Sequence, residues 1–442
     1  MKVYKKKLKV GEGMFIDNIM NKIWEPDYLK YSELYTEAMK LEAAELYNKV
    51  CNEKMGTIKY PGLTMNLLAT SGCPHRFKDD RISGCSMCNY QSDFVLSYAA
   101  MRALRKKDVN LYAKAVKNSF INVRGTKIKA NAFELITGND SFSEEEFPKE
   151  ILDELFLKEK LFVRAPYKYI MEVRASSVTN GRLELMKKYL GPKARVLIEF
   201  GLETGDDWLR NNWINKNVTN EQIEKAVELI HEQGFKVAMD IIIGIPGLTE
   251  EQSVEVFKKA VLYADSIGAD EIICLPLNRK EGTLQGFLHD KLKDNENLKK
   301  IGLVNDEKTG VPWLFTIMEA IYQVVNGNNE IIKKLNFAQL SKNKNLIANT
   351  VPYNSNMQCD CNYKIIDAIT ELKTTNNIED FKRKRKDLYM DSCYVEYKKL
   401  VDKQKACGNI KNTISKLGRE ISMILWPENW EDYYQILLYE LG

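Results

Sequence analysis

The chain has 442 residues, of which 44% are hydrophobic and 29% are charged, and its formal net charge is +4. These values predict one large domain or two ordinary ones, and the charge is too weak to indicate a nucleic-acid-binding protein by itself. No apolar run approaches the roughly 18 residues of a membrane-spanning helix, and no apolar block follows the basic start at Lys5–Lys7, so we expect a cytoplasmic protein. Nine unevenly spaced cysteines favour thiolate ligands and buried thiols over a disulfide framework.

Apolar segments followed by helical patterns dominate the first two thirds of the chain. The predicted strands cover residues 63–70, 128–136, 169–175, 195–200, 237–243 and 271–277. Helices are predicted over residues 26–50, 94–117, 144–156 and 181–189, and capping boxes start two more at Thr219/Gln222 and Thr249/Gln252. Six strand–helix units in succession predict an α/β fold with a parallel sheet, a partial (β/α)6 TIM-like barrel.

The pattern changes after about residue 290, where the chain becomes mostly helical and no further strand–helix alternation is expected. We therefore predict a helical leader over residues 1–58, the partial barrel over 59–290, and a helical C-terminal region over 291–442. The last region contains a loop with Cys359 and Cys361. This pair is interpreted as a second metal site completed by Cys393 or Cys407, as a reactive thiol pair, or as two unrelated thiols.

Three cysteines, Cys73, Cys85 and Cys88, lie in one loop directly after the first predicted strand. Three thiolates can hold three irons of a 4Fe–4S cluster and leave the fourth iron without a protein ligand. A structural zinc site with His75 as the fourth ligand is the alternative. The C-terminal ends of parallel strands, where active sites lie in such folds, also carry polar residues at 138–141, 172, 174 and 203.

These motifs, in this order, resemble the radical S-adenosylmethionine (SAM) superfamily over about residues 60–285. The long gap between the first two cysteines and the string Gly84-Cys85-Ser86-Met87-Cys88-Asn89-Tyr90 are similar to the branch that includes the Elongator catalytic subunit and the radical subunit of archaeosine synthase. The resemblance implies that Cys73, Cys85 and Cys88 bind a 4Fe–4S cluster and that SAM chelates its open iron. It further implies reductive cleavage of SAM to a 5′-deoxyadenosyl radical, with a flavodoxin or ferredoxin as reductant.

The resemblance also implies which residues bind SAM. Met87 and Tyr90 would line the adenine, and Glu172, with Arg174 beside it as a contact or as an ion-pair partner, would bind the ribose hydroxyls. The stretch Gly138-Asn139-Asp140-Ser141 departs from the usual Gly-Gly-Glu of the family, and Asp140 or Ser141 would accept hydrogen bonds from the SAM ammonium, unless the stretch is only a turn.

Four further positions match the family at later strand ends. Glu203 would contact the ribose or methionine moiety, and Lys216 would face the SAM carboxylate; the alternatives are a surface carboxylate and a solvated lysine. Gly244 and Leu277 would supply backbone and apolar contacts to the adenine.

The sequence is compatible with three hypotheses about substrate and function. A tRNA substrate, as in the branch that this chain resembles, would contact the basic runs Lys5–Lys7 and Lys382–Lys386 through its phosphates and stack on C-terminal aromatic residues. The alternative explanation of such a basic run is a solvated helix face. A small molecule or peptide of a biosynthetic pathway is the second reading. A non-catalytic, zinc-containing RNA-binding protein is the third.

Overall fold

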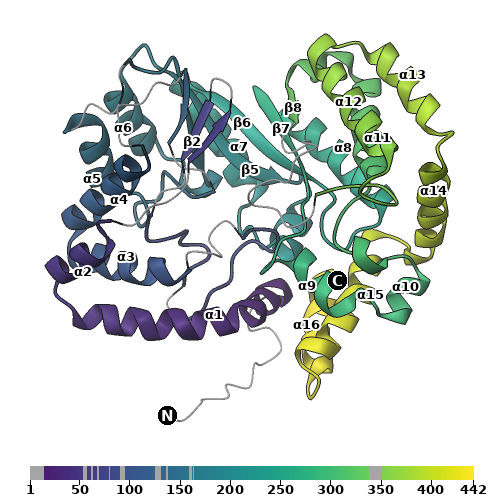
Figure 1. Ribbon diagram of the computed structural model, residues 1–442, viewed down its shortest axis with the longest axis horizontal. Coiled ribbons are helices and arrows are strands. Elements are labelled where there is room, and N and C mark those ends of the chain that lie inside the picture. Colours follow the sequence, from purple (N-terminus) through teal and green to yellow (C-terminus); the bar gives the residue numbers. More distant parts are fainter. Residues whose placement is uncertain are drawn as a thin grey trace.

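A computed structural model of the chain describes residues 14–52, 57–60, 63–66, 69–78, 80–89, 95–124, 131–135, 138–158, 162, 164–337 and 351–442. Its strands form one sheet with the linear order β1 to β8 (Figure 1). Strand β1 is antiparallel to β2, and β2 to β8 are parallel. The strands are β1 Thr57–Tyr60, β2 Leu63–Asn66, β3 Ala132–Glu134, β4 Lys168–Val173, β5 Arg195–Glu203, β6 Lys236–Ile243, β7 Glu271–Pro276 and β8 Leu335–Phe337.

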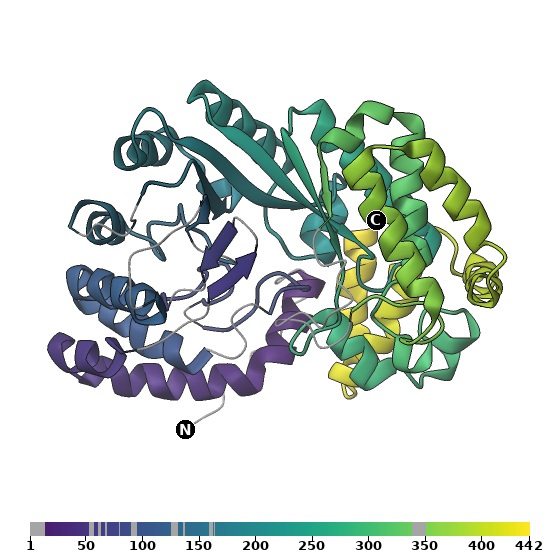
Figure 2. The ribbon, with the colours of Figure 1, turned by 45° about the horizontal axis from the view of Figure 1, so that its top comes forward.

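Helices cover the outer face of this curved sheet and build the C-terminal region (Figure 2). They are α1 Phe15–Lys40, α2 Ala43–Val50, α3 Val95–Lys107, α4 Val109–Arg124, α5 Lys149–Leu152, α6 Asn180–Leu190, α7 Asn220–Glu232, α8 Glu250–Ser266, α9 Leu284–Leu292, α10 Glu296–Lys300, α11 Leu314–Gly327, α12 Asp360–Thr375, α13 Ile378–Leu388, α14 Ser392–Gln404, α15 Ile410–Leu425 and α16 Trp430–Leu441. Short 3-10 or π turns are η2 Asp153–Leu157, η3 Ala175–Ser177, η4 Leu209–Trp213, η5 Asp306–Lys308, η6 Asn329–Lys333 and η7 Lys405–Cys407.

The six predicted strands correspond to β2 through β7, so the predicted parallel half-barrel is confirmed. Both predicted capping boxes are present, because the side chains of Thr219 and Thr249 accept the backbone N–H groups of Gln222 and Gln252. The expectation of no further strand–helix alternation after about residue 290 did not foresee β8, which pairs with β7 in parallel register. Strand β8 has only three residues, which is too short to show a period in the sequence.

Two predicted helices differ from the structure. Helix α1 begins at Phe15, and Pro26 lies inside it rather than near its start. The single helix predicted over 94–117 is two helices, because Asp108 accepts the N–H groups of Asn110 and Leu111 and thereby caps α4. The cap at Asp108 therefore divides the segment into two helices, although the helical spacing of its apolar residues continues past Asp108.

The two ends of the described chain pack against each other. The backbone N–H of Phe15 donates to Glu440 Oε1 at 2.9 Å, and the Phe15 ring contacts Trp426. Helix α1 also packs against α3 (Figure 1). None of the described helices combines the length and the hydropathy needed to cross a membrane.

Candidate functional site

The cysteine loop follows β2 and is clamped from outside by α1. The loop turns back on itself through the bridge between Phe77 and Ile82. Asp17 of α1 accepts hydrogen bonds from Lys78 at 3.0 Å and from Ser83 at 2.5 Å, and it pairs with Arg81 at 3.0 Å. One carboxylate thus joins three positions between the first and second cysteines.

The second half of the loop is fastened to the segment after β5. Ser86 donates its N–H to the Ile214 carbonyl at 2.8 Å and its hydroxyl to the Trp213 carbonyl at 2.9 Å. Asn215, at φ +60°, donates to the Gly84 carbonyl at 2.8 Å. The loop that carries the cysteines is therefore positioned by backbone groups as well as by Asp17.

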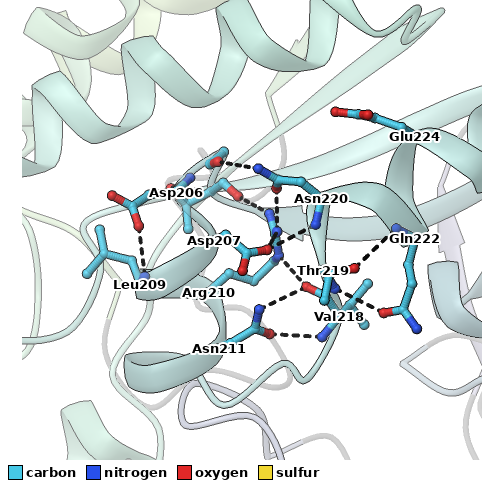
Figure 3. A network of polar contacts seen from close by, with 12 residues as sticks. Asp206, Asp207, Leu209, Arg210, Asn211, Val218, Thr219, Asn220, Gln222 and Glu224 are labelled. Carbon is cyan, nitrogen blue, oxygen red and sulfur yellow. Dashed lines mark hydrogen bonds and ion pairs between the residues drawn. The ribbon is translucent and has the colours of Figure 1, made fainter. Parts of the chain in front are cut away.

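The segment that supplies these contacts is itself held by a buried arginine (Figure 3). Arg210 is fully buried and donates to the carbonyls of Thr204 and Val218, both at 2.8 Å. It also binds the side chains of Asp207 and Asn220. This network fixes both ends of the 204–220 segment, which presents Asn215 and Lys216 to the cysteine loop.

Cationic side chains surround the three cysteines. Burial raises the pKa of Cys73 to about 12 and that of Cys85 above its usual value, while Arg174 opposes the shift at both thiols and Lys216 opposes it at Cys85. Lys280 interacts electrostatically with Cys88. Because an iron–sulfur cluster brings thiolates and net negative charge, these three cations fit such an occupant.

The spacing of the thiols speaks against a single zinc ion. Tetrahedral zinc with Zn–S bonds of about 2.3 Å needs sulfurs about 3.8 Å apart. Within the described residues, Cys73, Cys85, Cys88 and His75 do not supply three ligand atoms within 4.8 Å of one another. His75 Nε2 instead lies 2.6 Å from the Asn215 carbonyl oxygen, and burial lowers the pKa of His75 to about 3. The zinc interpretation with His75 is therefore not supported, and wider spacing suits three cysteines that bind different irons.

Glu203 and Lys216 form a buried ion pair next to the loop. Lys216 Nζ lies 2.7 Å from Glu203 Oε1, and neither side chain is solvated, so the surface interpretations of both residues were wrong. Gly201 makes room for the pair, because a Cβ there would collide with both charged ends. Glu203 has φ +62°, and its Oε2 is buried without a hydrogen-bond partner among the described residues. An acceptor left open in this way fits a ligand that brings a donor.

The loop after β3 is bound tightly to β4. Gly138, at φ +74°, donates its N–H to Glu172 Oε2 at 2.5 Å. Asp140 is buried and accepts from the Arg174 N–H at 3.2 Å and the Ser177 hydroxyl at 2.5 Å. Ser141 donates to the Glu172 carbonyl. Asn139 lies partly exposed between Gly138 and Asp140.

The remaining predicted SAM contacts lie around the same mouth of the half-barrel. Met87 is half-buried beside the cysteines, and Gln285 donates to its carbonyl. Gly244, at φ +91°, ends β6 and packs so closely on Pro312 that a Cβ would lie 2.8 Å from its ring. Leu277 is buried and donates its N–H to the Ile243 carbonyl. Tyr90 and Lys5–Lys7 lie outside the described residues.

Sequence reasoning named Glu172 but missed that it belongs to a layer of carboxylates inside the half-barrel. Ile170, Leu197 and Ala238 form an apolar layer on one face of the sheet. Two residues further along the same strands, on the same face, stand Glu172, Glu199 and Asp240. The available signal was a single acidic residue in each otherwise apolar strand.

The carboxylates of this layer are buried and repel one another. Burial, followed by repulsion from neighbouring carboxylates, raises the pKa of Glu134, Glu199 and Asp240 well above the usual range. Glu134 is hydrogen-bonded to Glu172, and Glu199 to Asp240. Asp240 Oδ1 has no hydrogen-bond partner among the described residues.

The basic run Lys382–Lys386 lies on α13 and is largely neutralised. Lys382 pairs with Glu379 and Arg383 with Asp380. Lys384 binds Glu371, and Arg385 binds Glu319 with two hydrogen bonds and stacks on Tyr322. The C-terminal aromatic residues include pairs that stack on each other, such as Trp426 with Tyr433. These contacts favour the interpretation of a paired helix face over a phosphate-binding one.

Comparison with known proteins agrees with this geometry. Residues 67–260 match the sequence model of the radical SAM superfamily. An uncharacterized protein of Methanocaldococcus jannaschii, MJ0550, is 22% identical over 262 residues, which are 59% of this chain and 64% of that protein. Archaeosine synthase subunit beta of Methanosarcina acetivorans is 24% identical over 255 residues, 57% of this chain and 64% of that protein. The matched region thus spans less than two thirds of either relative.

A solved structure of Elp3 from Methanocaldococcus infernus shares 18% sequence identity with a TM-score of 0.37, over 59% of each chain. The chain therefore contains a radical SAM domain over residues 67–260. The cofactors of this family are a 4Fe–4S cluster and SAM, as expected. The interpretation as a non-catalytic RNA-binding protein was wrong, because the domain is that of an enzyme.

Proposed function

We propose that this enzyme binds a 4Fe–4S cluster through Cys73, Cys85 and Cys88 and abstracts a hydrogen atom from a substrate in the half-barrel. The observation that carries the proposal is the three-cysteine loop at the C-terminal ends of the parallel strands, inside a radical SAM domain and beside Arg174 and Lys216. When bound, the cluster and SAM supply a 5′-deoxyadenosyl radical, with a flavodoxin or ferredoxin as the electron source.

The residues of this chain bind and orient these groups. Lys216 offers a buried cation for the SAM carboxylate, and Glu203 Oε2 offers an open acceptor for its ammonium or ribose. The N–H of Gly138 orients the carboxylate of Glu172 toward the ribose. Asp140 and Ser141 hold this loop against β4. Met87, Tyr90, Gly244 and Leu277 are proposed to line the adenine.

The carboxylate layer constrains the substrate. Glu199 on β5 and Asp240 on β6 lie on the same face of the sheet, and the open Oδ1 of Asp240 can accept a hydrogen bond from a donor. A group that carries an amine or amidine would bind there, because a cation offsets the repulsion between these buried carboxylates. A phosphate would be repelled. The reacting end of the substrate is therefore proposed to be cationic.

The similarity to archaeosine synthase subunit beta supports a modified tRNA base as the carrier of this group. A free small molecule or peptide is the second candidate, favoured by the neutralised basic run on α13. Binding of tRNA across a salt series separates the two, because phosphate contacts weaken steeply with salt. Binding that is absent at low salt would favour the small molecule.

The experiment that tests the catalytic proposal is anaerobic reconstitution with iron and sulfide, followed by dithionite and SAM. We expect 5′-deoxyadenosine from the wild type and none from Cys85→Ala. Absence of 5′-deoxyadenosine from the wild type, with cationic candidate substrates and tRNA both supplied, would contradict the proposal. Cys51→Ala, a half-exposed thiol on the leader, serves as the matched control.

A further inference from the structure

A second group of three cysteines lies in the C-terminal region, away from the cysteine loop of the radical SAM domain. Cys359 is the residue before α12, Cys361 lies in the first turn of α12, and Cys393 lies in the first turn of α14. The Sγ atoms of Cys359 and Cys361 are 2.6 Å apart, and those of Cys359 and Cys393 are 2.9 Å apart. Among the described residues, this is the group of three whose ligand atoms all lie within 4.8 Å.

We propose that Cys359, Cys361 and Cys393 form a metal site that binds one zinc ion through three thiolates. A disulfide would join two sulfurs at about 2.05 Å and leave the third aside, whereas all three converge here. Sulfurs around a tetrahedral zinc ion lie about 3.8 Å apart, which a small outward shift provides. The contrast with Cys73, Cys85 and Cys88, whose sulfurs are more widely spaced, favours a single ion here over a second cluster.

Each sulfur of the group has an N–H donor from the protein. Asn354 Nδ2 donates to Cys361 Sγ at 3.2 Å, and the backbone N–H of Cys361 donates to Cys359. The backbone N–H of Ser355 donates to Cys393. Hydrogen bonds of this kind hold thiolate ligands in place around a metal.

Two helix N-termini add to this stabilisation. Helix α12 has 16 residues and α14 has 13, and both begin at the group. The positive ends of their dipoles favour thiolates.

Three protein thiolates leave one coordination position for zinc. Cys407 does not fill it, because its thiol is directed at the Ile301 carbonyl, 3.4 Å away. Cys361 and Cys393 are buried, but Cys359 is partly exposed, so solvent reaches the group from the side of Cys359. A water or a small solute is therefore the fourth ligand.

The site joins several elements of the C-terminal region. Asn354, which is fully buried, donates to Cys361 and accepts the N–H of Phe315 at the start of α11. The neighbouring Tyr353 carbonyl accepts from Lys308, which lines the same cavity as Gly244 at the end of β6. We infer a structural role, in which the ion holds α11, α12 and α14 around the loop of residues 351–359.

Metal analysis of the full chain tests this inference. Wild type, Cys361→Ala, Cys85→Ala and the matched buried-thiol control Cys407→Ala would be purified anaerobically and assayed for zinc and iron. We expect about one zinc per chain in the wild type and in Cys407→Ala, and loss of zinc but not of iron in Cys361→Ala. Cys85→Ala should lose iron and keep zinc, so failure of the cluster proposal and failure of the zinc proposal are distinguishable.

Three results would overturn the zinc site. The first is the absence of zinc from the wild type, and the second is zinc retained in folded Cys361→Ala. The third is about eight irons per chain in the wild type and about four in Cys361→Ala, because this difference indicates a second 4Fe–4S cluster. If Cys361→Ala does not fold, Co2+ is added to metal-stripped Cys85→Ala, whose visible spectrum is free of the iron–sulfur cluster. Tetrahedral cobalt–thiolate bands are expected, and their absence from folded protein overturns the proposal.

Discussion

Asp17 offers a quantitative test of how the cysteine loop is held. Burial alone would raise the pKa of Asp17, but the hydrogen bond from Ser83 and the charges of Lys78 and Arg81 lower it from 3.8 to about 2. A shift of this size corresponds to roughly 2 kcal/mol of the free energy of unfolding at neutral pH. Asp17→Asn keeps the shape of the side chain and removes the charge. We therefore expect the variant to lose about 2 kcal/mol.

The pH dependence gives the sign of the effect. Because the pKa of Asp17 is lower in the folded chain, its contribution is complete above the unfolded value of 3.8 and is lost as the pH falls toward 2. The difference between wild type and Asp17→Asn, measured by chemical denaturation, should be constant from about pH 5 to pH 8 and should shrink only below about pH 4. Iron content, measured in parallel, shows whether cluster loss contributes.

Asp80→Asn is the matched control. Asp80 also pairs with Arg81 at 3.0 Å, but its side chain is 73% exposed. Exposed pairs contribute about 0.2–1 kcal/mol, so this variant should be nearly as stable as the wild type. Equal losses for Asp17→Asn and Asp80→Asn, or a difference that shrinks between pH 7 and pH 5, would refute the reasoning.

Three further predictions concern the walls of the site. Gly201→Ala should separate Glu203 from Lys216 and weaken SAM binding, measured by equilibrium dialysis. Gly181→Ala is the control, because a Cβ there meets open space, and it should bind SAM as the wild type does. Equal SAM affinities of the two variants would contradict a role of the Glu203–Lys216 pair in SAM binding. Arg210→Met should lower the free energy of unfolding, measured in urea, by about 2–4 kcal/mol, because the buried carbonyls of Thr204 and Val218 lose their donor. A loss below about 1 kcal/mol would show that contacts other than those of Arg210 hold the 204–220 segment. Glu199→Gln should raise the midpoint of thermal unfolding, because it removes the repulsion between Glu199 and Asp240. It should lower substrate turnover, because the lumen loses a carboxylate. A lower midpoint would contradict repulsion between the two carboxylates.

The sequence by itself determined the elements and the class of the fold. Strands β2 to β7 are short apolar runs, and the Thr219 and Thr249 capping boxes are contacts between residues three positions apart. Such signals are local, so they can be seen without a structure. The cysteine loop was found in the same way, because its three thiols are close in sequence. Strand β8 was missed because three residues carry no period.

Only the tertiary structure decided which polar groups meet. Asp17 contacts Ser83 across 66 positions, and Cys359 contacts Cys393 across 34. Glu199 and Asp240 stand on neighbouring strands, where each looks like an isolated charge in the sequence. Glu203 and Lys216 were predicted to contact SAM, with surface charges as the alternative, and the left-handed backbone of Glu203 and the missing side chain of Gly201 allow them to pair. Burial and pairing depend on the packing of distant segments, which no local pattern records.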